Sequence, residues 1–161
     1  MIDELRRMLK HRLGLPLPGL EAQFRMAHIE RQLNLNRYKT PADARKSSVL
    51  ILLYEEAGRI KLPLILRPPG SGTHSGQVSL PGGKHELSDE NIAATALRET
   101  EEEIGISVSS IELLGQLTQL YIPPSNFIVY PYVGILKTPA IFIPEEKEVV
   151  KVILLDLESL L

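Results

Sequence analysis

The sequence predicts a single layered α/β domain, and three features lead to that prediction. The chain has 161 residues, of which 43% are hydrophobic, which suffices for one sizeable core but not for two domains of ordinary size. Short leucine-rich or β-branched runs indicate strands. Stretches of helical periodicity lie before and between these runs. Strands and helices in this order are typical of a sheet covered by helices.

The N-terminal part is predicted to be helical. Apolar residues recur at helical spacing over the first thirteen residues, namely Ile2, Leu5, Met8, Leu9 and Leu13. Glycines and prolines at 14–19 end this helix, and a second helical pattern covers 20–33. We therefore expect residues 1–44 to form a helical extension and residues 45–161 to form the main domain.

The main domain is predicted to begin with two strands and a loop. The strands cover residues 47–54 and 60–66 around a turn at 55–58, and the loop at 67–77 is rich in proline, glycine and serine. A short strand at 77–80 then leads to a turn at Pro81-Gly82-Gly83. The later elements are expected to be a helix at 90–104 that Gly105 ends, strands at 111–121, 127–137 and 149–154, and a short helical end.

Composition limits the classes of partner. The formal net charge is −2, with 18 basic and 20 acidic residues well mixed, which gives no footprint for nucleic acid or an anionic membrane. The chain has no cysteine, so a metal would be held by oxygen or histidine nitrogen, and carboxylates favour a hard cation such as magnesium. Charges interrupt the stretch from Met1 to Arg12, which fits neither a signal peptide nor a membrane span. We therefore expect a cytoplasmic protein whose function resides in local sites.

Some glutamates in the predicted helix at 90–104 lie on or beside its apolar face. In a solvated charge run they would lie opposite that face. At about 100° per residue, Glu103 falls inside the apolar arc, Glu99 and Glu102 lie at its edge, and Glu101 points away. The three inward-leaning glutamates are spaced i, i+3 and i+4, so their carboxylates lie close together and repel one another. Arg98 is the basic residue of this stretch and lies to one side. We therefore expect these three carboxylates to bind a divalent cation, with structural salt bridges as the alternative.

Eight residues carry a resemblance to the Nudix hydrolase family, whose box reads G-x5-E-x7-R-E-U-x-E-E-x-G-U with U apolar. They are Gly83, Asp89, Arg98, Glu99, Glu102, Glu103, Gly105 and Ile106. Either Asp89 replaces the first box glutamate with one extra residue before Arg98, or Glu90 keeps that role after a small shift. The resemblance implies an α/β/α sandwich with a mixed sheet. It also implies metal-dependent hydrolysis of a phosphoanhydride bond in a nucleoside diphosphate derivative.

A second motif resembles the coenzyme A pyrophosphatase branch of this family, L-L-T-x-R-S-x-x-x-R-x-H-x-G-x-V-x-F-P-G-G. The matching residues before the shared Pro-Gly-Gly are Leu64, Arg67, His74, Gly76 and Val78. The chain departs from the motif at Pro68, Gly72 and Leu80, which replace a serine, an arginine and a phenylalanine. The resemblance implies cleavage of coenzyme A or acyl-CoA into 3′,5′-ADP and 4′-phosphopantetheine. The alternatives are a Nudix enzyme for ADP-ribose or another nucleoside diphosphate derivative, and a module that binds a nucleotide without cutting it.

The resemblance also implies the metal ligands. Glu99, Glu102 and Glu103 would bind Mg²⁺ or Mn²⁺, and the backbone carbonyl of Gly83 would add a further ligand. The alternative for Gly83 is a plain tight turn.

The expected catalytic residues are Arg98, Glu102 and Glu148. Arg98 would organise the site by binding the carboxylate of Asp89 or Glu90, although a structural ion pair would look the same. Glu148 is the candidate general base, while a solvated loop of glutamates at 145–148 is the alternative.

The substrate residues are expected to be Arg67, His74, Gly76 and Gln77, of which the histidine would otherwise be a turn residue. A subunit contact in a homodimer would be formed by the N-terminal helix and the loop at 67–77.

Overall fold

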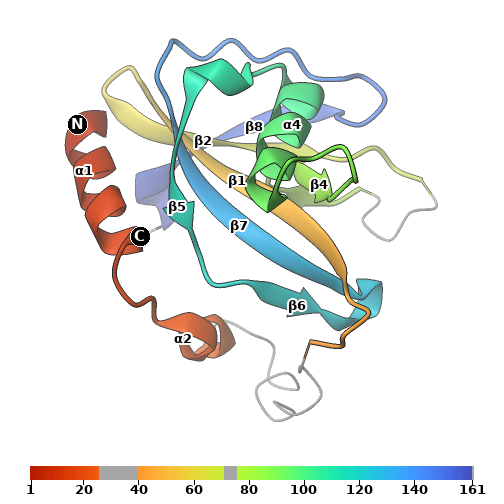
Figure 1. Ribbon diagram of the computed structural model, residues 1–161. Coiled ribbons are helices and arrows are strands. Elements are labelled where there is room, and N and C mark those ends of the chain that lie inside the picture. The colour runs from red at the N-terminus through yellow and green to blue at the C-terminus, as the bar shows by residue number, and fades with distance from the viewer. Residues whose placement is uncertain (26–39, 71–75, 161) are drawn as a thin grey trace.

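The computed structural model describes residues 1–25, 40–70 and 76–160, and within this part eight strands form one mixed sheet (Figure 1). The strands are β1 (Arg45–Glu56), β2 (Arg59–Leu66), β3 (Val78–Ser79), β4 (Gly82–Lys84), β5 (Ile111–Gln116), β6 (Leu120–Ile122), β7 (Phe127–Leu136) and β8 (Lys151–Asp156). The helices are α1 (Ile2–Leu13), α2 (Gly19–Arg25) and α4 (Ile92–Ile104), with short 3₁₀ turns η2 (Val108–Ser110), η3 (Pro123–Ser125) and η4 (Leu157–Leu160).

Strand β1 is the centre of the sheet. The strand order is β3-β2-β1-β7-β5, while β4 pairs with β1, β6 with β7 and β8 with β2. The first part of β1 runs parallel to β7, from the pair Arg45–Phe127 to the pair Leu53–Ile135. Its last residues turn back at Gly58 and pair antiparallel with β2. The sheet is therefore mixed, as predicted.

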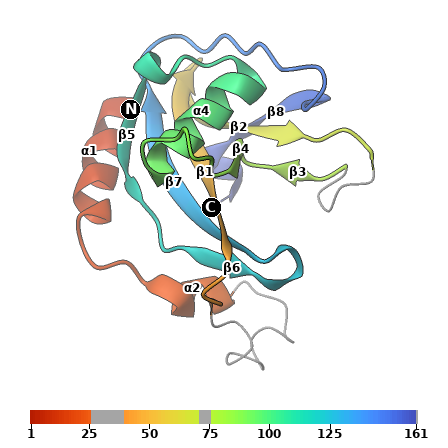
Figure 2. The same ribbon diagram turned by 45° about the vertical axis from the view of Figure 1, so that its right-hand side comes forward.

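Side chains that alternate along β1 divide the core into two layers. Leu50, Leu52 and Tyr54 belong to the cluster beneath α4, whereas Leu53 belongs to a second cluster on the opposite face. This alternation follows from the two-residue period of a strand. Apolar residues along one side of helix α1 cover the second cluster. Figures 1 and 2 show α1 and α4 on different sides of the sheet. The predicted α/β/α sandwich is confirmed.

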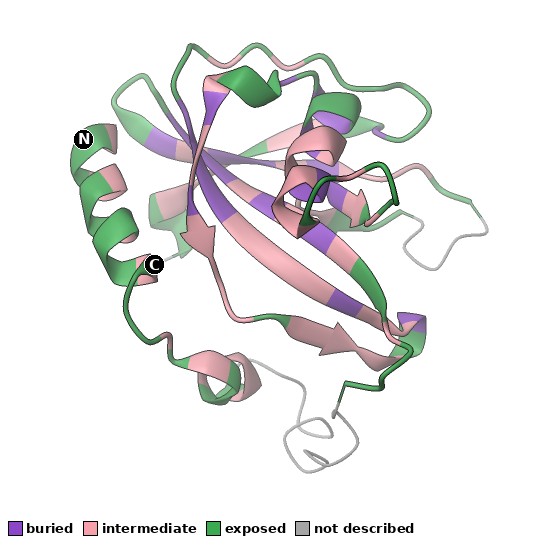
Figure 3. Cartoon of the chain, in the orientation of Figure 1, coloured by how far each residue is buried: buried purple, intermediate pink, exposed green. Residues whose placement is uncertain are grey.

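Burial follows this layering. Figure 3 shows buried residues in the middle of β1, at the C-terminal end of β7 and on the side of α4 that faces the sheet. In α1 the predicted helix is confirmed, but Met8 is 59% exposed and lies outside the packed stripe. None of the helices in the described ranges is both long and apolar enough to cross a membrane.

The predicted turn at Pro81-Gly82-Gly83 is wrong, because Gly82 and Gly83 belong to β4. They pair with Val49 and Ser48 of β1. A Cβ atom on Gly82 would overlap the Ser48 carbonyl oxygen, so glycine is needed here for close contact between strands. Glycine is common both in turns and where two strands lie close together, and the Pro-Gly-Gly pattern alone favoured the turn.

Other element boundaries moved by a few residues. The single strand predicted at 111–121 is two strands, because the pairing of β5 with β7 shifts between Leu113 and Gly115 and β6 begins only at Leu120. The last strand begins at Lys151 rather than 149, since Val149 is buried within the preceding loop. Helix α2 ends at Arg25, and the remainder of the predicted helix at 20–33 lies outside the described residues.

Candidate active site

Helix α4 presents its glutamates to the edge of the sheet. It begins at the cap residue Asn91, whose side chain accepts hydrogen bonds from the backbone N–H groups of Ala93 and Ala94. It ends at Gly105, where the backbone is left-handed with φ of 71°. The end at Gly105 was predicted from the sequence, whereas the cap at Asn91 was not. The helix packs on β1 and β4, which fixes the direction of its inner face.

Glu103 is the most buried carboxylate on this face, with 1% of the residue exposed. One oxygen accepts a hydrogen bond from Nη2 of Arg67 at 2.7 Å, and the other accepts one from the backbone N–H of Gly82 at 2.8 Å. Burial raises the pKa of Glu103 to about 7, although the contacts with Gly82 and Arg67 oppose this shift. The predicted inward position is confirmed, and Arg67 and Gly82 are partners of Glu103 that sequence reasoning missed.

Glu99 and Glu102 share one arginine. Nη1 of Arg98 lies 3.0 Å from Oε1 of Glu99 and donates a hydrogen bond to Oε2 of Glu102 at 2.8 Å. Burial raises the pKa of Glu99, Arg98 opposes that shift, and the nearby charges of Glu102 and Glu148 add to it. Glu101 is exposed on the other side of the helix, as predicted. The two glutamates therefore carry more negative charge than the single arginine between them can neutralise.

The guanidinium of Arg98 also fixes the loop before the helix. Its Nε and Nη2 donate to the two oxygens of Asp89 at 2.8 and 3.1 Å, so the arginine binds the carboxylate as a fork. This pairing holds the pKa of Asp89 well below its usual range. Glu90 is exposed, so Asp89 is the partner of Arg98. The Thr95 hydroxyl also donates to Asp89 and lies 2.8 Å from Nδ1 of His85, two contacts that sequence reasoning missed.

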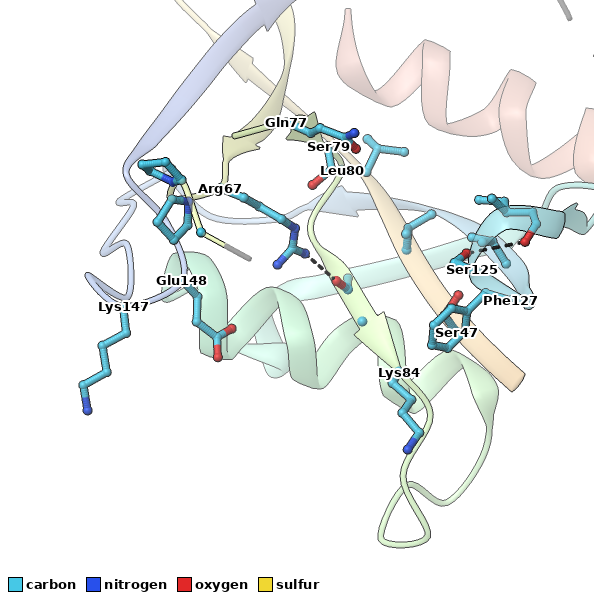
Figure 4. Close-up of a pocket in the computed structure, with 18 residues that line it drawn as sticks. Ser47, Arg67, Gln77, Ser79, Leu80, Lys84, Ser125, Phe127, Lys147 and Glu148 are labelled. Carbon is cyan, nitrogen blue, oxygen red and sulfur yellow. Dashed lines mark hydrogen bonds between the residues drawn. The ribbon is translucent and has the colours of Figure 1, made fainter. Parts of the chain in front are cut away.

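A cavity of about 820 Å³ opens beside these residues (Figure 4). It is lined by Ser47, Val49, Arg67, Pro68, Pro69, Gly70, Gln77, Ser79, Leu80, Gly82, Gly83, Lys84, Ile122, Ser125, Phe127, Val129, Lys147 and Glu148. One part of the wall is polar and adjoins β4, and another is apolar and adjoins the β6–β7 corner. Such a cavity has the size of a nucleotide-binding pocket.

Glu148 reaches the cavity because its loop is attached to the end of α4. The backbone N–H groups of Ile143 and Glu145 donate to the carbonyl oxygens of Ile104 and Glu103 at 2.9 and 3.0 Å. The chain then turns, and Figure 4 shows the carboxylate of Glu148 projecting toward the space beside Arg67. Of the three glutamates at 145–148, only Glu148 lines the cavity.

The predicted substrate residues separate into three groups. Arg67 and Gln77 line the cavity, and the backbone N–H of Arg67 donates to the Gln77 carbonyl at 3.0 Å. Gly76 is exposed and is not among the residues that line it. His74 lies outside the described residues. Sequence reasoning missed Lys84 and Phe127 in the wall, because nothing in their local pattern distinguishes them from surface or strand residues.

The NUDIX domain family matches residues 44–161, which is most of the chain. The chain therefore belongs to the Nudix family.

Relatives with assigned names support this membership. Nudix hydrolase 15, mitochondrial, of Arabidopsis thaliana is 39% identical over 101 residues, covering 62% of this chain and 35% of that protein. A protein of Yersinia enterocolitica named uncharacterized Nudix hydrolase NudL is 45% identical over 76 residues, covering 47% of this chain and 38% of that protein. The chain thus spans little more than a third of the length of these two relatives.

Solved structures share the fold. An Ap4A hydrolase of C. elegans in a binary complex superposes with a TM-score of 0.59 at 20% identity, covering 72% of this chain and 82% of that one. The NUDIX domain of Shewanella oneidensis NrtR, complexed with ADP ribose, superposes with a TM-score of 0.57 at 19% identity, covering 84% and 86%. At these identities the likeness concerns the fold alone.

Nudix hydrolases generally need divalent metal ions, and the donor set here suits such a cation. Within the described ranges no three carboxylate or histidine side chains converge on one point, and Arg67 and Arg98 donate hydrogen bonds to Glu103 and Glu102. The donors are nevertheless hard oxygens whose mutual repulsion a cation would relieve. A Cβ on Gly83 would overlap the Glu99 carboxylate, so only glycine lets the backbone lie this close to it.

Proposed function

We propose that this chain hydrolyses a phosphoanhydride bond in a nucleoside diphosphate derivative. The observation that carries the proposal is the position of two α4 carboxylates against β4, Glu99 beside Gly83 and Glu103 bound to the backbone N–H of Gly82, next to a nucleotide-sized cavity. Phosphoanhydrides resist water because their oxygens are negative, so hydrolysis requires cations at the bond and a positioned nucleophile. The wall of the cavity contains the carboxylate of Glu148 and the side chains of Arg67, Lys84 and Lys147. The α4 carboxylates of Glu99 and Glu103, which would hold a cation, lie against the wall residues Arg67, Gly82 and Gly83.

We assign the metal to Glu99, Glu102, Glu103 and the Gly83 carbonyl. Bound Mg²⁺ or Mn²⁺ would neutralise charge that develops on the diphosphate and would acidify a water molecule. Arg98 keeps the glutamates and the loop at Asp89 in place, because one guanidinium contacts both.

Glu148 is the proposed general base. Its carboxylate projects into the cavity from a different loop, so it can take the proton of the attacking water without being a ligand. Gln77 and Lys84 are proposed to contact the substrate, since both line the cavity.

The substrate we propose is coenzyme A or acyl-CoA, cleaved to 3′,5′-ADP and 4′-phosphopantetheine. Support comes from the motif residues before β4, of which Arg67 lines the cavity and Val78 begins β3. The alternative is ADP-ribose or another nucleoside diphosphate derivative, which the departures from the motif at Pro68 and Gly72 favour. A binding module without activity is disfavoured, because all three metal-binding glutamates of the box are retained.

A substrate panel separates these possibilities. The protein would be incubated with Mg²⁺ or Mn²⁺ and coenzyme A, acetyl-CoA, ADP-ribose or diadenosine polyphosphates, and products would be identified by chromatography. We expect 3′,5′-ADP and 4′-phosphopantetheine from coenzyme A. Turnover of ADP-ribose alone would transfer the assignment to the alternative, and no turnover of any substrate with either metal would refute the proposed activity.

A further inference from the structure

Arg67 joins three elements at one point. It follows the last residue of β2, and its Nη2 atom donates to the Gly82 carbonyl at 3.0 Å in β4 and to Glu103 at 2.7 Å in α4 (Figure 4 shows the first of these bonds). The backbone N–H of Gly82 donates to the other oxygen of Glu103. The three groups thus form a closed ring of hydrogen bonds in which strand, helix and arginine fix one another.

The two hydrogen bonds from Arg67 Nη2 use both hydrogens of that nitrogen. A guanidinium Nη2 carries two N–H groups, and here both point at fixed acceptors rather than into the cavity. Glu103 in turn has 1% exposure, so in the intact protein its carboxylate depends on Arg67 and Gly82 for hydrogen bonds. The primary partner of Arg67 is therefore Glu103, although part of its side chain faces the cavity.

The ring also controls the neighbouring residue Gly83. Gly83 follows Gly82 directly and lies against the Glu99 carboxylate, so a shift of β4 would change the position of the backbone relative to both glutamates. The i, i+4 spacing on α4 fixes Glu99 and Glu103 relative to each other. Only a link between β4 and the helix fixes them relative to Gly83.

We propose that Arg67 is a positioning residue for the metal site, which holds Glu103 and the backbone of β4 in the arrangement that binds the cation. The substrate-phosphate role predicted from the sequence is secondary to this one. The inference rests on the proposed function in one respect, namely that Glu103 and Gly83 serve a divalent cation. Side chains that orient metal ligands typically change metal affinity 10- to 100-fold when removed.

Direct metal binding tests the proposal without substrate. Mn²⁺ binding to wild type, Arg67→Gln and Arg67→Lys would be measured by the electron paramagnetic resonance signal of free Mn²⁺. We expect the glutamine variant to bind Mn²⁺ at least about 10-fold more weakly, and the lysine variant to recover part of the loss. The matched control is Arg59→Gln, which removes an exposed arginine paired with Asp156 at 2.8 Å and should bind Mn²⁺ like wild type.

Kinetics at saturating Mn²⁺ then distinguish positioning from substrate binding. A positioning role predicts a lower kcat with KM for the substrate changed less than about threefold. Unchanged Mn²⁺ affinity together with a KM raised 10-fold or more would overturn the proposal and make Arg67 a phosphate-binding residue.

A double-mutant cycle keeps the inference testable if the metal assignment itself fails. Melting temperatures would be compared for wild type, Arg67→Gln, Glu103→Gln and the double variant. Because the lone arginine deletion leaves a buried carboxylate unpaired, it should lower the melting temperature by several degrees more in wild type than in the Glu103→Gln background. Additive effects would show that Arg67 does not hold Glu103. Absence of Mn²⁺ binding in wild type would refute the metal assignment and with it the proposed function, but not the link between Arg67 and Glu103 that the cycle measures.

Discussion

The glutamates of α4 differ in environment although they lie within five residues of one another. Glu103 is buried against Arg67, Glu99 is 14% exposed in its side chain, and Glu102 is 57% exposed and held by Arg98. Glu101 is exposed and accepts a hydrogen bond from the backbone N–H of Val108. This difference provides a matched pair of substitutions on one helix.

Glu102→Gln and Glu101→Gln make the same chemical change at adjacent positions. The first removes a proposed metal ligand and should lower kcat/KM on the order of 100-fold or more, because loss of even an outer partner of a metal ligand costs 10- to 100-fold. The second should leave kcat/KM within about twofold, and both variants should melt near the wild-type temperature. Steady-state kinetics with coenzyme A at several Mg²⁺ concentrations provide the measurement; equal losses in both variants would contradict the metal assignment.

Phe127 offers an aromatic surface at the apolar end of the cavity. The guanidinium of Arg45 lies 4.2 Å from the ring centroid, and Ser125 accepts a hydrogen bond from Arg45, which keeps the ring in place. We expect Phe127→Ala to weaken binding of 3′,5′-ADP roughly 5- to 150-fold, since stacking on a base contributes about 1–3 kcal/mol. Inorganic pyrophosphate, which has no base, should bind the variant as it binds wild type. Calorimetry with both ligands checks this, and equal weakening would exclude a role in base binding.

Side-chain directions on α4 could be predicted from sequence, but partners from other elements could not. Helical geometry placed Glu103 inward and Glu101 outward because the period of a helix is fixed. The contact of Glu103 with Arg67 spans 36 residues and depends on how β2 and β4 meet at the helix. The choice of Asp89 over Glu90 depends on the path of an irregular loop, which no periodicity describes.

At the scale of elements, α1 is part of the core although the NUDIX match begins after it. Its inner side chains, Leu5 and Leu9 among them, pack on the cluster formed by Leu53, Leu62 and Val133. Leu13 lies so close to the sheet that a Cβ on Gly115 would approach its Cβ to 2.9 Å. A surface on the sheet that would otherwise be exposed is therefore covered by the N-terminal residues.

Leu9→Ala and Met8→Ala test this coverage with adjacent residues of one helix. We expect Leu9→Ala to lower the free energy of unfolding by about 1–3 kcal/mol, less than for a fully buried leucine because Leu9 is half-buried. Met8 is exposed, so its truncation should change stability by less than about 0.5 kcal/mol. Urea unfolding followed by circular dichroism measures both values. An unchanged free energy of unfolding in Leu9→Ala would mean that packing of α1 contributes little to the stability of the fold.

Elements with a strong period could be predicted, whereas those set by long-range pairing could not. The strands β1, β2 and β7 and the helices α1 and α4 follow from runs and spacings of apolar residues. The three-residue strand β4 consists of Gly82, Gly83 and Lys84, which have no strand pattern of their own. It forms because β1 offers a partner, and that information lies more than thirty residues away in the sequence.

For the whole molecule, two buried carboxylates should give opposite dependences of stability on pH. The pKa of Asp89 lies below its usual value, so its contribution is present at neutral pH and is lost as the solution becomes strongly acidic. The pKa of Glu103 is raised from 4.5 to about 7, so the folded state holds that proton more tightly than the unfolded chain does. The stability that Glu103 contributes is therefore complete below pH 4.5 and is lost as the pH rises toward 7.

The Glu103→Gln variant isolates this second contribution, because glutamine cannot titrate. With a chelator present to exclude metal, wild type should lose roughly 2–3 kcal/mol more than the variant between pH 5 and pH 8, from a shift of about 2.5 pKa units at about 1.4 kcal/mol per unit. Glu101→Gln removes an exposed carboxylate from the same helix and should keep the wild-type slope. Urea unfolding at five pH values between 5 and 8 gives the three slopes. If wild type and Glu103→Gln lose stability in parallel, then Arg67 and Gly82 compensate the buried charge fully, and the raised pKa of Glu103 is refuted.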